Sequence, residues 1–278
     1  MNKFIIAAVQ MNTQDNKQDN LRKAQEFVEE AAAKGASLVV FPESMDYIGP
    51  GGSKYAEYIP EGECFRLFAE LAKKHNLWIH SGSIREICDG DPRPYNSSFV
   101  VSPQGDLSAI YRKIHLFNVD VKEGPAVRES DKVSCGNDLV LLDTGDDGVG
   151  KLGLSICYDM RFAELYRILA LHGANILLVP SYFNLITGKD HWEPLLRTRA
   201  IENGCYVVAP DQIGNKPQMM PAYGNTMIID PWGMVIARAS NKECIITAEI
   251  DLDYVESVRK QTYTLSNRRT DLYEIKEL

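Results

Sequence analysis

The sequence lacks the features that mark several classes of protein. Its six cysteines include no CxxC pair, and none has a histidine at the spacing of a zinc site, so no structural metal is indicated. No dense block of Lys and Arg occurs and the net charge is −8, so neither nucleic acid nor an anionic membrane is an expected partner. No apolar run approaches the roughly 20 residues that span a bilayer.

Two further absences concern targeting and organisation. The strand-like FIIAAVQ begins at residue 4 and leaves no room for a signal peptide, so we expect a cytoplasmic protein with free thiols. No repeat, low-complexity tract or linker divides the chain, and we therefore expect one domain over residues 1–278. From about residue 251 it should form a C-terminal helix and tail.

What is present is an alternation of short apolar runs with amphipathic segments. Helices are expected at 19–35, with Asn20 as the N-cap, and at 62–75, 162–172 and 191–203, with Pro194 tolerated near the first turn. Strands are expected at 4–10, 37–43, 77–84, 97–113 and 139–157 (the last two as hairpins, the second with residues 145–150 at its tip), at 174–180 and from 205 to 250. Hairpins mixed with βα units predict an α/β protein with two sheets packed face to face and helices outside.

Three strand ends carry reactive side chains. Glu43 follows one strand in FPES, Lys113 follows another in AIYRK, and Cys157 follows a third in GLSIC. Ligands in open α/β sheets bind beyond the carboxyl ends of strands, so these three groups are candidates for one site.

An acid, an ammonium and a thiol together suit acyl transfer. A thiol attacks as its thiolate, which a nearby ammonium and the N–H groups of a helix start would favour. Lys113 and the N–H of Tyr158 could hold the oxyanion formed on attack, and Glu43 could exchange protons with the leaving amine and with water. Taken singly, each residue also has a structural explanation: a buried thiol, a loop-end carboxylate and a solvated lysine.

The motifs FPES (41–44), YRKIHLFNVDV (111–121) and GLSICYDMRFAEL (153–165) resemble the glutamate, lysine and cysteine motifs of the nitrilase, or carbon–nitrogen hydrolase, superfamily. The resemblance continues through residues 179–203 and 223–237, nearly to the end of the chain. It implies a four-layer αββα sandwich of two mixed sheets, and a cofactor-free Glu–Lys–Cys triad acting on non-peptide C–N bonds. It also implies a homo-oligomer, a dimer or larger, with the C-terminal segment from 251 at its interface.

Carried over to this chain, the resemblance makes Glu43 the general base and acid, Lys113 the oxyanion partner and Cys157 the nucleophile. Glu129 in VRES matches a second glutamate that positions the lysine or the substrate amide. CYDMRFAEL and HLFNVDV resemble the Nit branch, which includes omega-amidases and deaminated glutathione amidases. The 210–224 loop matches neither group closely, and whether it forms a lid stays open.

The expected reaction is hydrolysis of a small carboxylate-bearing amide to acid and ammonia through a Cys157 thioester, with no metal or cofactor. The residues expected to hold the substrate lie in the loop after Glu43, beside Cys157 and in segment 181–192. They are Tyr47, Arg161, Tyr182, Phe183, Thr187, His191 and Trp192. Each also has a structural explanation, as a core aromatic or as a partner of a neighbouring carboxylate.

Other functions remain open on the sequence. The same superfamily includes N-carbamoyl and aliphatic amide hydrolases, and nitrile hydrolysis is disfavoured because nitrilases resemble Cys-Trp-Glu where this chain has Cys-Tyr-Asp. A non-catalytic metabolite-binding protein could use the same sandwich, although the complete triad argues against it. A thiol redox enzyme would need a resolving cysteine, and none occurs within about 20 residues of Cys157.

Overall fold

The computed structural model describes residues 2–121, 126–146 and 148–278 and shows two β-sheets packed face to face. The first sheet has the order β17 (Cys244–Asp251), β1 (Lys3–Gln10), β2 (Ala36–Val40), β3 (Trp78–His80), β5 (Tyr95–Val101) and β4 (Ile84–Glu86), with β6 (Leu107–Arg112) also paired to β5. The second has the order β16 (Val235–Arg238), β15 (Met227–Ile229), β12 (Tyr206–Ala209), β11 (Ile176–Leu178), β10 (Lys151–Leu154) and β9 (Leu141–Asp143). Both sheets mix parallel and antiparallel pairs.

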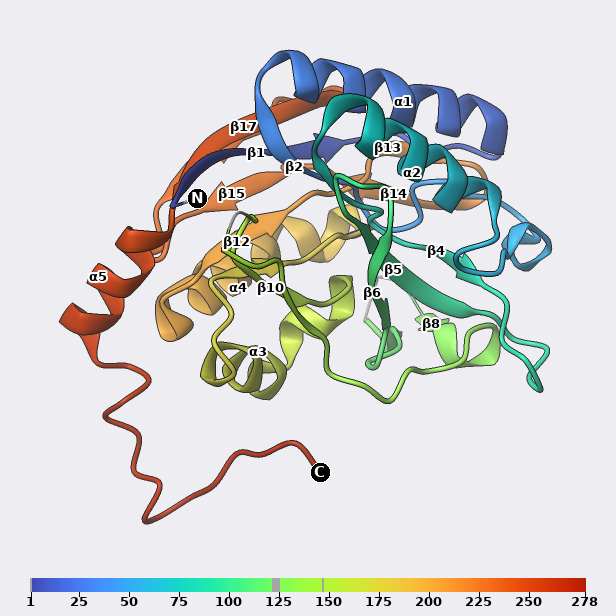
Figure 1. Cartoon of the computed structure of the whole chain (residues 1–278). Helices are drawn as coiled ribbons and strands as arrows, with labels where there is room; N and C mark the ends of the chain where they lie inside the picture. The colour runs from blue at the N-terminus through green and yellow to red at the C-terminus, as the bar shows by residue number, and fades with distance from the viewer. Residues whose placement is uncertain (1, 122–125, 147) are drawn as a thin grey trace.

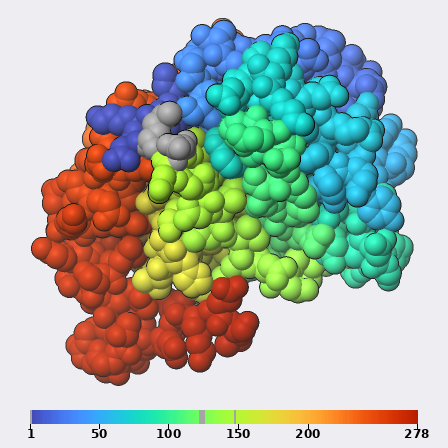
Figure 2. Space-filling model, in the orientation of Figure 1, coloured from blue at the N-terminus to red at the C-terminus, as the bar shows by residue number. Residues whose placement is uncertain are grey.

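Helices cover the outer face of each sheet, which completes the expected αββα sandwich. Helices α1 (Lys17–Ala33) and α2 (Glu63–His75) lie over the first sheet, and α3 (Ala163–Leu171) and α4 (Leu185–Asn203) lie on the side of the second (Figure 1). Helix α5 (Leu252–Thr262) follows β17, and the chain beyond it extends away from the sheets (Figures 1 and 2). No helix in the described part of the chain has both the length and the apolar character to cross a membrane.

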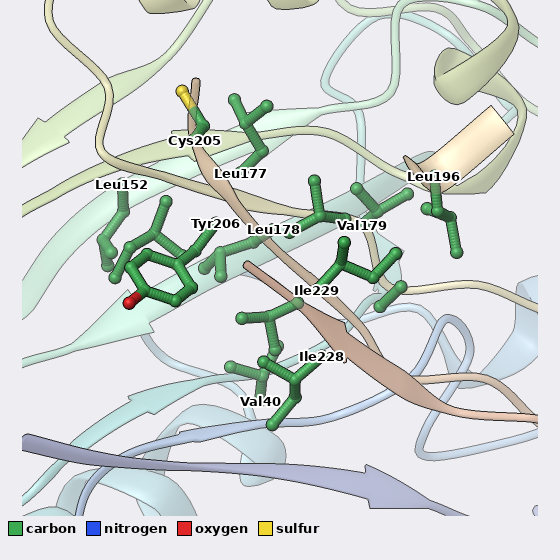
Figure 3. Close-up of a cluster of buried hydrophobic side chains, with 14 of the residues drawn as sticks. Val40, Leu152, Leu177, Leu178, Val179, Leu196, Cys205, Tyr206, Ile228 and Ile229 are labelled. Carbon is green, nitrogen blue, oxygen red and sulfur yellow. The ribbon is translucent and has the colours of Figure 1, made fainter. Parts of the chain in front are cut away.

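The period-two pattern of the strands divides their side chains between two cores. Along β1, Ile6 and Ala8 face the core between the sheets, whereas Ala7 and Val9 face the core beneath α1 and α2. Figure 3 shows the inter-sheet core, where Val40 of the first sheet lies near Ile228 of the second. Strands buried on both faces read as uninterrupted apolar runs, as the sequence of 37–41 does.

Two helix starts differ from those predicted. Helix α1 is capped by Asn16, whose side chain accepts from the Asp19 N–H, and Asn20 is instead buried, donating to the carbonyls of Gln14 and Asp46. Helix α4 begins at Leu185 rather than His191, because the Asn184 side chain caps the Thr187 N–H. Pro194 therefore lies in the interior of this helix and not near its first turn.

The sequence also concealed two small hairpins. Residues 210–224, expected as a loop, contain the antiparallel pair β13 (Ile213–Lys216) and β14 (Met219–Tyr223). A second pair joins β7 (Asn118–Asp120) to β8 (Ala126–Arg128). The hairpin of β9 and β10 is present as predicted, and residue 147 at its tip lies outside the described residues.

Candidate active site

Four residues from distant parts of the chain meet where the two sheets end. Glu43 follows β2, Lys113 follows β6, Cys157 follows β10, and Glu129 opens a short 3₁₀ helix (Glu129–Asp131) after β8. Strands β2 and β10 belong to different sheets, so the packing of the sandwich is what brings Glu43 and Cys157 together.

A network of buried charges connects three of them. The Lys113 Nζ lies 2.9 Å from Glu43 Oε1 and 3.0 Å from Glu129 Oε2, and only 2% of the lysine side chain is exposed. The Asn96 side chain donates to Glu43 Oε1 (2.8 Å) and Glu129 Oε1 (3.3 Å), and the Phe117 N–H donates to Glu129 Oε2. These contacts fix both carboxylates around one ammonium group.

The network also fixes the protonation of the lysine. Burial by itself would lower the pKa of Lys113, but the negative charges of Glu129 and Glu43 outweigh it and hold this pKa above its ordinary value. Burial would likewise raise the pKa of Glu129, and the charge of Lys113 reverses that effect and lowers it. Lys113 is therefore a fixed cation beside the sulfur.

Cys157 occupies a sharp turn between strand and helix. Its φ is +49°, a left-handed conformation that non-glycine residues seldom adopt, and its N–H donates to the Pro180 carbonyl (2.9 Å). Its Sγ lies 3.8 Å from the Tyr182 carbonyl oxygen, and the Tyr182 N–H donates to Glu43 Oε2 (2.9 Å). One residue, Tyr182, thus contacts both the thiol and the carboxylate.

The resting thiol differs from the sequence expectation of a favoured thiolate. Burial raises the pKa of Cys157 well above its usual value, and the Glu43 carboxylate, both by its charge and by a hydrogen bond, raises it further. The charge of Lys113 opposes this rise but does not overcome it. The sulfur is therefore a neutral thiol until a neighbouring base removes its proton, and Glu43 is the carboxylate hydrogen-bonded to it.

A buried aspartate, which the sequence analysis did not single out, shapes the Cys157 turn. Asp159 accepts from the Ile156 N–H (2.8 Å) and the Tyr111 hydroxyl (2.7 Å), and its other oxygen faces the N–H and Nδ1 of His115 (3.1 and 2.8 Å). The His115 ring stacks on Phe162 at a centroid distance of 3.7 Å. As a result, Cys157–Arg161 forms a 3₁₀ helix, and α3 begins only at Ala163.

The sulfur opens into a cavity of about 850 Å³. Glu43, Lys113, Glu129, Cys157 and Tyr158 line it. Of the residues expected to hold the substrate, Tyr47, Arg161, Tyr182 and Phe183 also line it. The cavity continues to Gln218, Met219 and Met220 of the 210–224 hairpin, where the Tyr182 hydroxyl donates to the Met220 carbonyl.

Three of the residues expected to hold the substrate lie elsewhere. Trp192 is fully buried and donates to the Asn225 carbonyl, and Thr187 is part of the cap of α4, where its hydroxyl accepts from the Asn184 side chain. His191 lies behind the cavity wall, with its Nδ1 3.2 Å from Arg161 Nη1. The early start of α4 is the reason, because it places Trp192 on the buried face of the helix.

Asn96 is the second site residue that sequence reasoning missed. It stands inside β5, in an apolar run, and only the strand pairing shows that its side chain faces Glu43 and Glu129. Within residues 2–121, 126–146 and 148–278, no group of three or more His, Cys, Asp or Glu side chains is placed to hold a metal ion.

With this geometry established, the chain was compared with known proteins. Residues 5–260 match the carbon–nitrogen hydrolase family. The chain is 41% identical to the omega-amidase NIT2 of Danio rerio over 99% of its own length and 98% of the relative. It is 40% identical to the deaminated glutathione amidase of Dictyostelium discoideum, over 97% and 95% of the two chains.

The fold comparison agrees. The crystal structure of the Caenorhabditis elegans NitFhit protein superimposes with a TM-score of 0.91 at 36% identity, covering 99% of this chain and 67% of that one. Family match, full-length relatives and shared fold point the same way: the chain belongs to the carbon–nitrogen hydrolase family of the nitrilase superfamily and is an amidase that hydrolyses amide C–N bonds.

Proposed function

We propose that the chain hydrolyses small carboxylate-bearing amides through a thioester on Cys157, in the manner of an omega-amidase or a deaminated glutathione amidase. The observation that carries the proposal is the convergence of the Cys157 thiol, the Glu43 carboxylate and the Lys113 ammonium at one wall of the cavity. The names of the two relatives support the substrate class.

Acylation begins with the neutral thiol. Glu43 takes the Sγ proton as the sulfur attacks the carbonyl carbon, and the oxyanion is stabilised by the Lys113 ammonium and the N–H of Tyr158. The C–N bond then breaks, and Glu43 returns the proton to the departing nitrogen. Because the thiol and the carboxylate are already hydrogen-bonded, the first proton moves over a preformed contact.

Deacylation reverses the roles. Glu43 removes a proton from water, the hydroxide adds to the thioester carbonyl, and the C–S bond breaks to release the acid and restore the thiol. Lys113 again stabilises the negative oxygen. Glu129 keeps Lys113 in place, and it does so without consuming the Glu43 oxygen that faces the Tyr182 N–H.

Arg161 is the residue we assign to the carboxylate on the acyl part of the substrate. It lines the cavity from the 3₁₀ helix that begins with Cys157, and its guanidinium lies over the rings of Tyr158 and Phe183. No carboxylate of the described residues lies within ion-pair distance of it. A bidentate contact to a substrate carboxylate would supply that missing partner.

The test is a product screen by mass spectrometry, with ammonia measured in parallel, over α-ketoglutaramate, deaminated glutathione, succinamate, glutaramate and N-carbamoyl amino acids. We expect turnover of the carboxylate-bearing amides and none by Cys157→Ala. Exposed Cys135 gives a control, since Cys135→Ala should retain full activity. Iodoacetamide labelling of Cys157 should be blocked by substrate, while labelling of Cys135 should not. Activity in Cys157→Ala, or preference for N-carbamoyl compounds, would contradict the proposal.

A further inference from the structure

Positively charged side chains lie on both sides of the reacting sulfur. Arg161 lines the cavity wall formed by the 3₁₀ helix after Cys157. Arg85 of β4 lines the cavity beside Glu129, together with Arg128 and Lys132 from the end of β8 and the 3₁₀ helix that follows it. The first side is already assigned to the acyl part of the substrate, and the second has no role in the proposed chemistry.

Arg85 faces the catalytic groups because of its strand register. It lies directly opposite Asn96 in the antiparallel pairing of β4 with β5, and opposite residues in such a pair project from the same face of the sheet. The Asn96 side chain donates to both Glu43 and Glu129. Arg85 therefore projects toward the carboxylates of the site and into the cavity.

The guanidinium of Arg85 is incompletely paired. Its Nη1 lies 3.9 Å from Glu129 Oε1, which is an ion-pair distance but too long for a hydrogen bond. This nitrogen is buried and has no hydrogen-bond partner among the residues that the structure describes. A buried donor left without a partner costs about 1–3 kcal/mol, so an anionic ligand at Arg85 would be strongly favoured.

The contacts place Arg85 on the leaving-group side. A chain of contacts runs from Arg85 to Glu129, from Glu129 to Lys113 (3.0 Å) and from Lys113 to Glu43 (2.9 Å), and Glu43 is the group bonded to the thiol. In the proposed mechanism Glu43 protonates the departing nitrogen, so that nitrogen leaves toward Glu43. Whatever is attached to the nitrogen extends toward Arg85.

We infer that the preferred substrate is a secondary amide whose departing amine carries a carboxylate, which Arg85 binds. This inference rests on the proposed function and narrows it, because the leaving group is then an amino acid or a short peptide rather than ammonia. The reaction balances with one water: the C–N bond breaks, hydroxyl adds to the acyl carbon, and hydrogen adds to the nitrogen.

The dimensions and charges of the cavity agree with such a substrate. A volume of about 850 Å³ is toward the upper end of the roughly 300–1,000 Å³ typical of pockets for drug-sized ligands, and a primary amide of a five-carbon acid is much smaller than those ligands. Arg128 and Lys132 add positive charge at the rim, and no carboxylate in the described part of the chain pairs with either. The competing explanation is that Arg85 serves only as a counter-ion for Glu129.

Three amides of glutaric acid separate these explanations. Glutaramate has an unsubstituted nitrogen, N-glutarylglycine carries a carboxylate on the amine side, and N-glutarylglycinamide has the same length without that charge. We expect kcat/KM to be highest for N-glutarylglycine, by about tenfold over N-glutarylglycinamide, since one charge-assisted contact supplies at least that factor.

Variants then assign the preference to Arg85. In Arg85→Met, the ratio of kcat/KM for N-glutarylglycine to that for N-glutarylglycinamide should fall about tenfold, and Arg85→Lys should restore part of it. Arg66→Met, on the exposed side of α2, should leave the ratio unchanged. If Arg85→Met slows all three amides equally, the residue is only a counter-ion and the inference is overturned.

Two other outcomes are equally decisive. If glutaramate is hydrolysed and N-glutarylglycine is not, the enzyme is a thiol amidase of primary amides, so the inference fails while the proposed function stands. If none of the three amides, nor any in the wider screen, is hydrolysed, both fail together.

Discussion

The floor and the rim of the cavity are built in different ways. On the floor, Glu43, Lys113 and Glu129 pair with one another, and Asn96 binds both carboxylates, so each charge has its partner inside the protein. At the rim, Arg161 contacts aromatic rings and a histidine. A floor whose groups hold each other performs the same chemistry on any amide, whereas a rim that leaves its cations unmatched selects which amide enters.

The largest expected effect comes from removing the acid–base group of the floor. Glu43→Gln should lower kcat by about 10³-fold or more, because general acid–base catalysis alone contributes roughly 10²–10⁴-fold. The amide cannot activate water, so any acyl-enzyme formed should persist, and intact-protein mass spectrometry should show a mass increase equal to the acyl group. Full turnover by this variant would remove Glu43 from the mechanism and the floor from the comparison.

The next effect tests whether the floor depends on the turn that presents the sulfur. Asp159→Asn replaces an acceptor of the Ile156 N–H and Tyr111 hydroxyl bonds by a group with one fewer acceptor. We expect kcat to fall about 10–100-fold with KM changing much less, as expected when a small misplacement of a reacting group lowers the rate. A change in KM alone, with kcat intact, would show that Asp159 serves binding rather than positioning.

A rim variant should show the opposite kinetic signature. Arg161→Met should raise KM for glutaramate about tenfold, the cost of one charge-assisted contact, while lowering kcat less. Butyramide, which lacks the carboxylate, serves as the matched substrate, and its kcat/KM should be similar in both proteins. Equal losses for glutaramate and butyramide would mean that Arg161 does not distinguish substrates by charge.

The smallest effect on turnover, and a measurable one on stability, is expected at Lys216. Only 6% exposed, it donates to Gln212 Oε1 (2.8 Å) and Asn12 Oδ1 (2.9 Å), and burial lowers its pKa from 10.5 to about 7. Between these values the unfolded chain binds a proton that the folded chain does not. The free energy of unfolding should therefore decrease as the pH falls from 10.5 to 7, by up to about 1.4 kcal/mol per pH unit, and level off below 7.

The measurement is urea denaturation at pH 7, 8 and 9 for the native chain and for Lys216→Met, which cannot titrate. The difference between their unfolding free energies should change with pH in the direction given. A difference that stays constant would show that Lys216 keeps its proton in the folded protein.

The sequence predicted the floor better than the rim, for physical reasons. Glu43, Lys113 and Cys157 each follow a strand, and the end of a strand is visible as the point where an apolar run stops. Asn96 was missed because it lies within a strand, and its direction depends on pairing with another strand. Trp192 and Thr187 were assigned to the site because the cap at Asn184 was overlooked, and a helix that starts six residues earlier turns its faces away from those expected.

The hairpin of β13 and β14 escaped prediction for a related reason. Its strands are short and contain Gly214 and Pro221, which weaken the alternating pattern by which a strand is recognised in sequence. The pairing is supported by neighbours distant in sequence, such as the bond from the Gln212 side chain to the backbone carbonyl of Glu43 (3.0 Å). Tertiary contacts of that kind leave no local signal.

Tyr182 has a consequence for anyone who would redesign this enzyme. Its amide nitrogen holds Glu43, its carbonyl lies against the sulfur, and its hydroxyl holds the hairpin at Met220. An engineer who reshapes the hairpin to admit a bulkier amide therefore also disturbs the proton shuttle. Libraries built there should be ranked by maximal velocity as well as by the range of compounds accepted, because the two properties share one tyrosine.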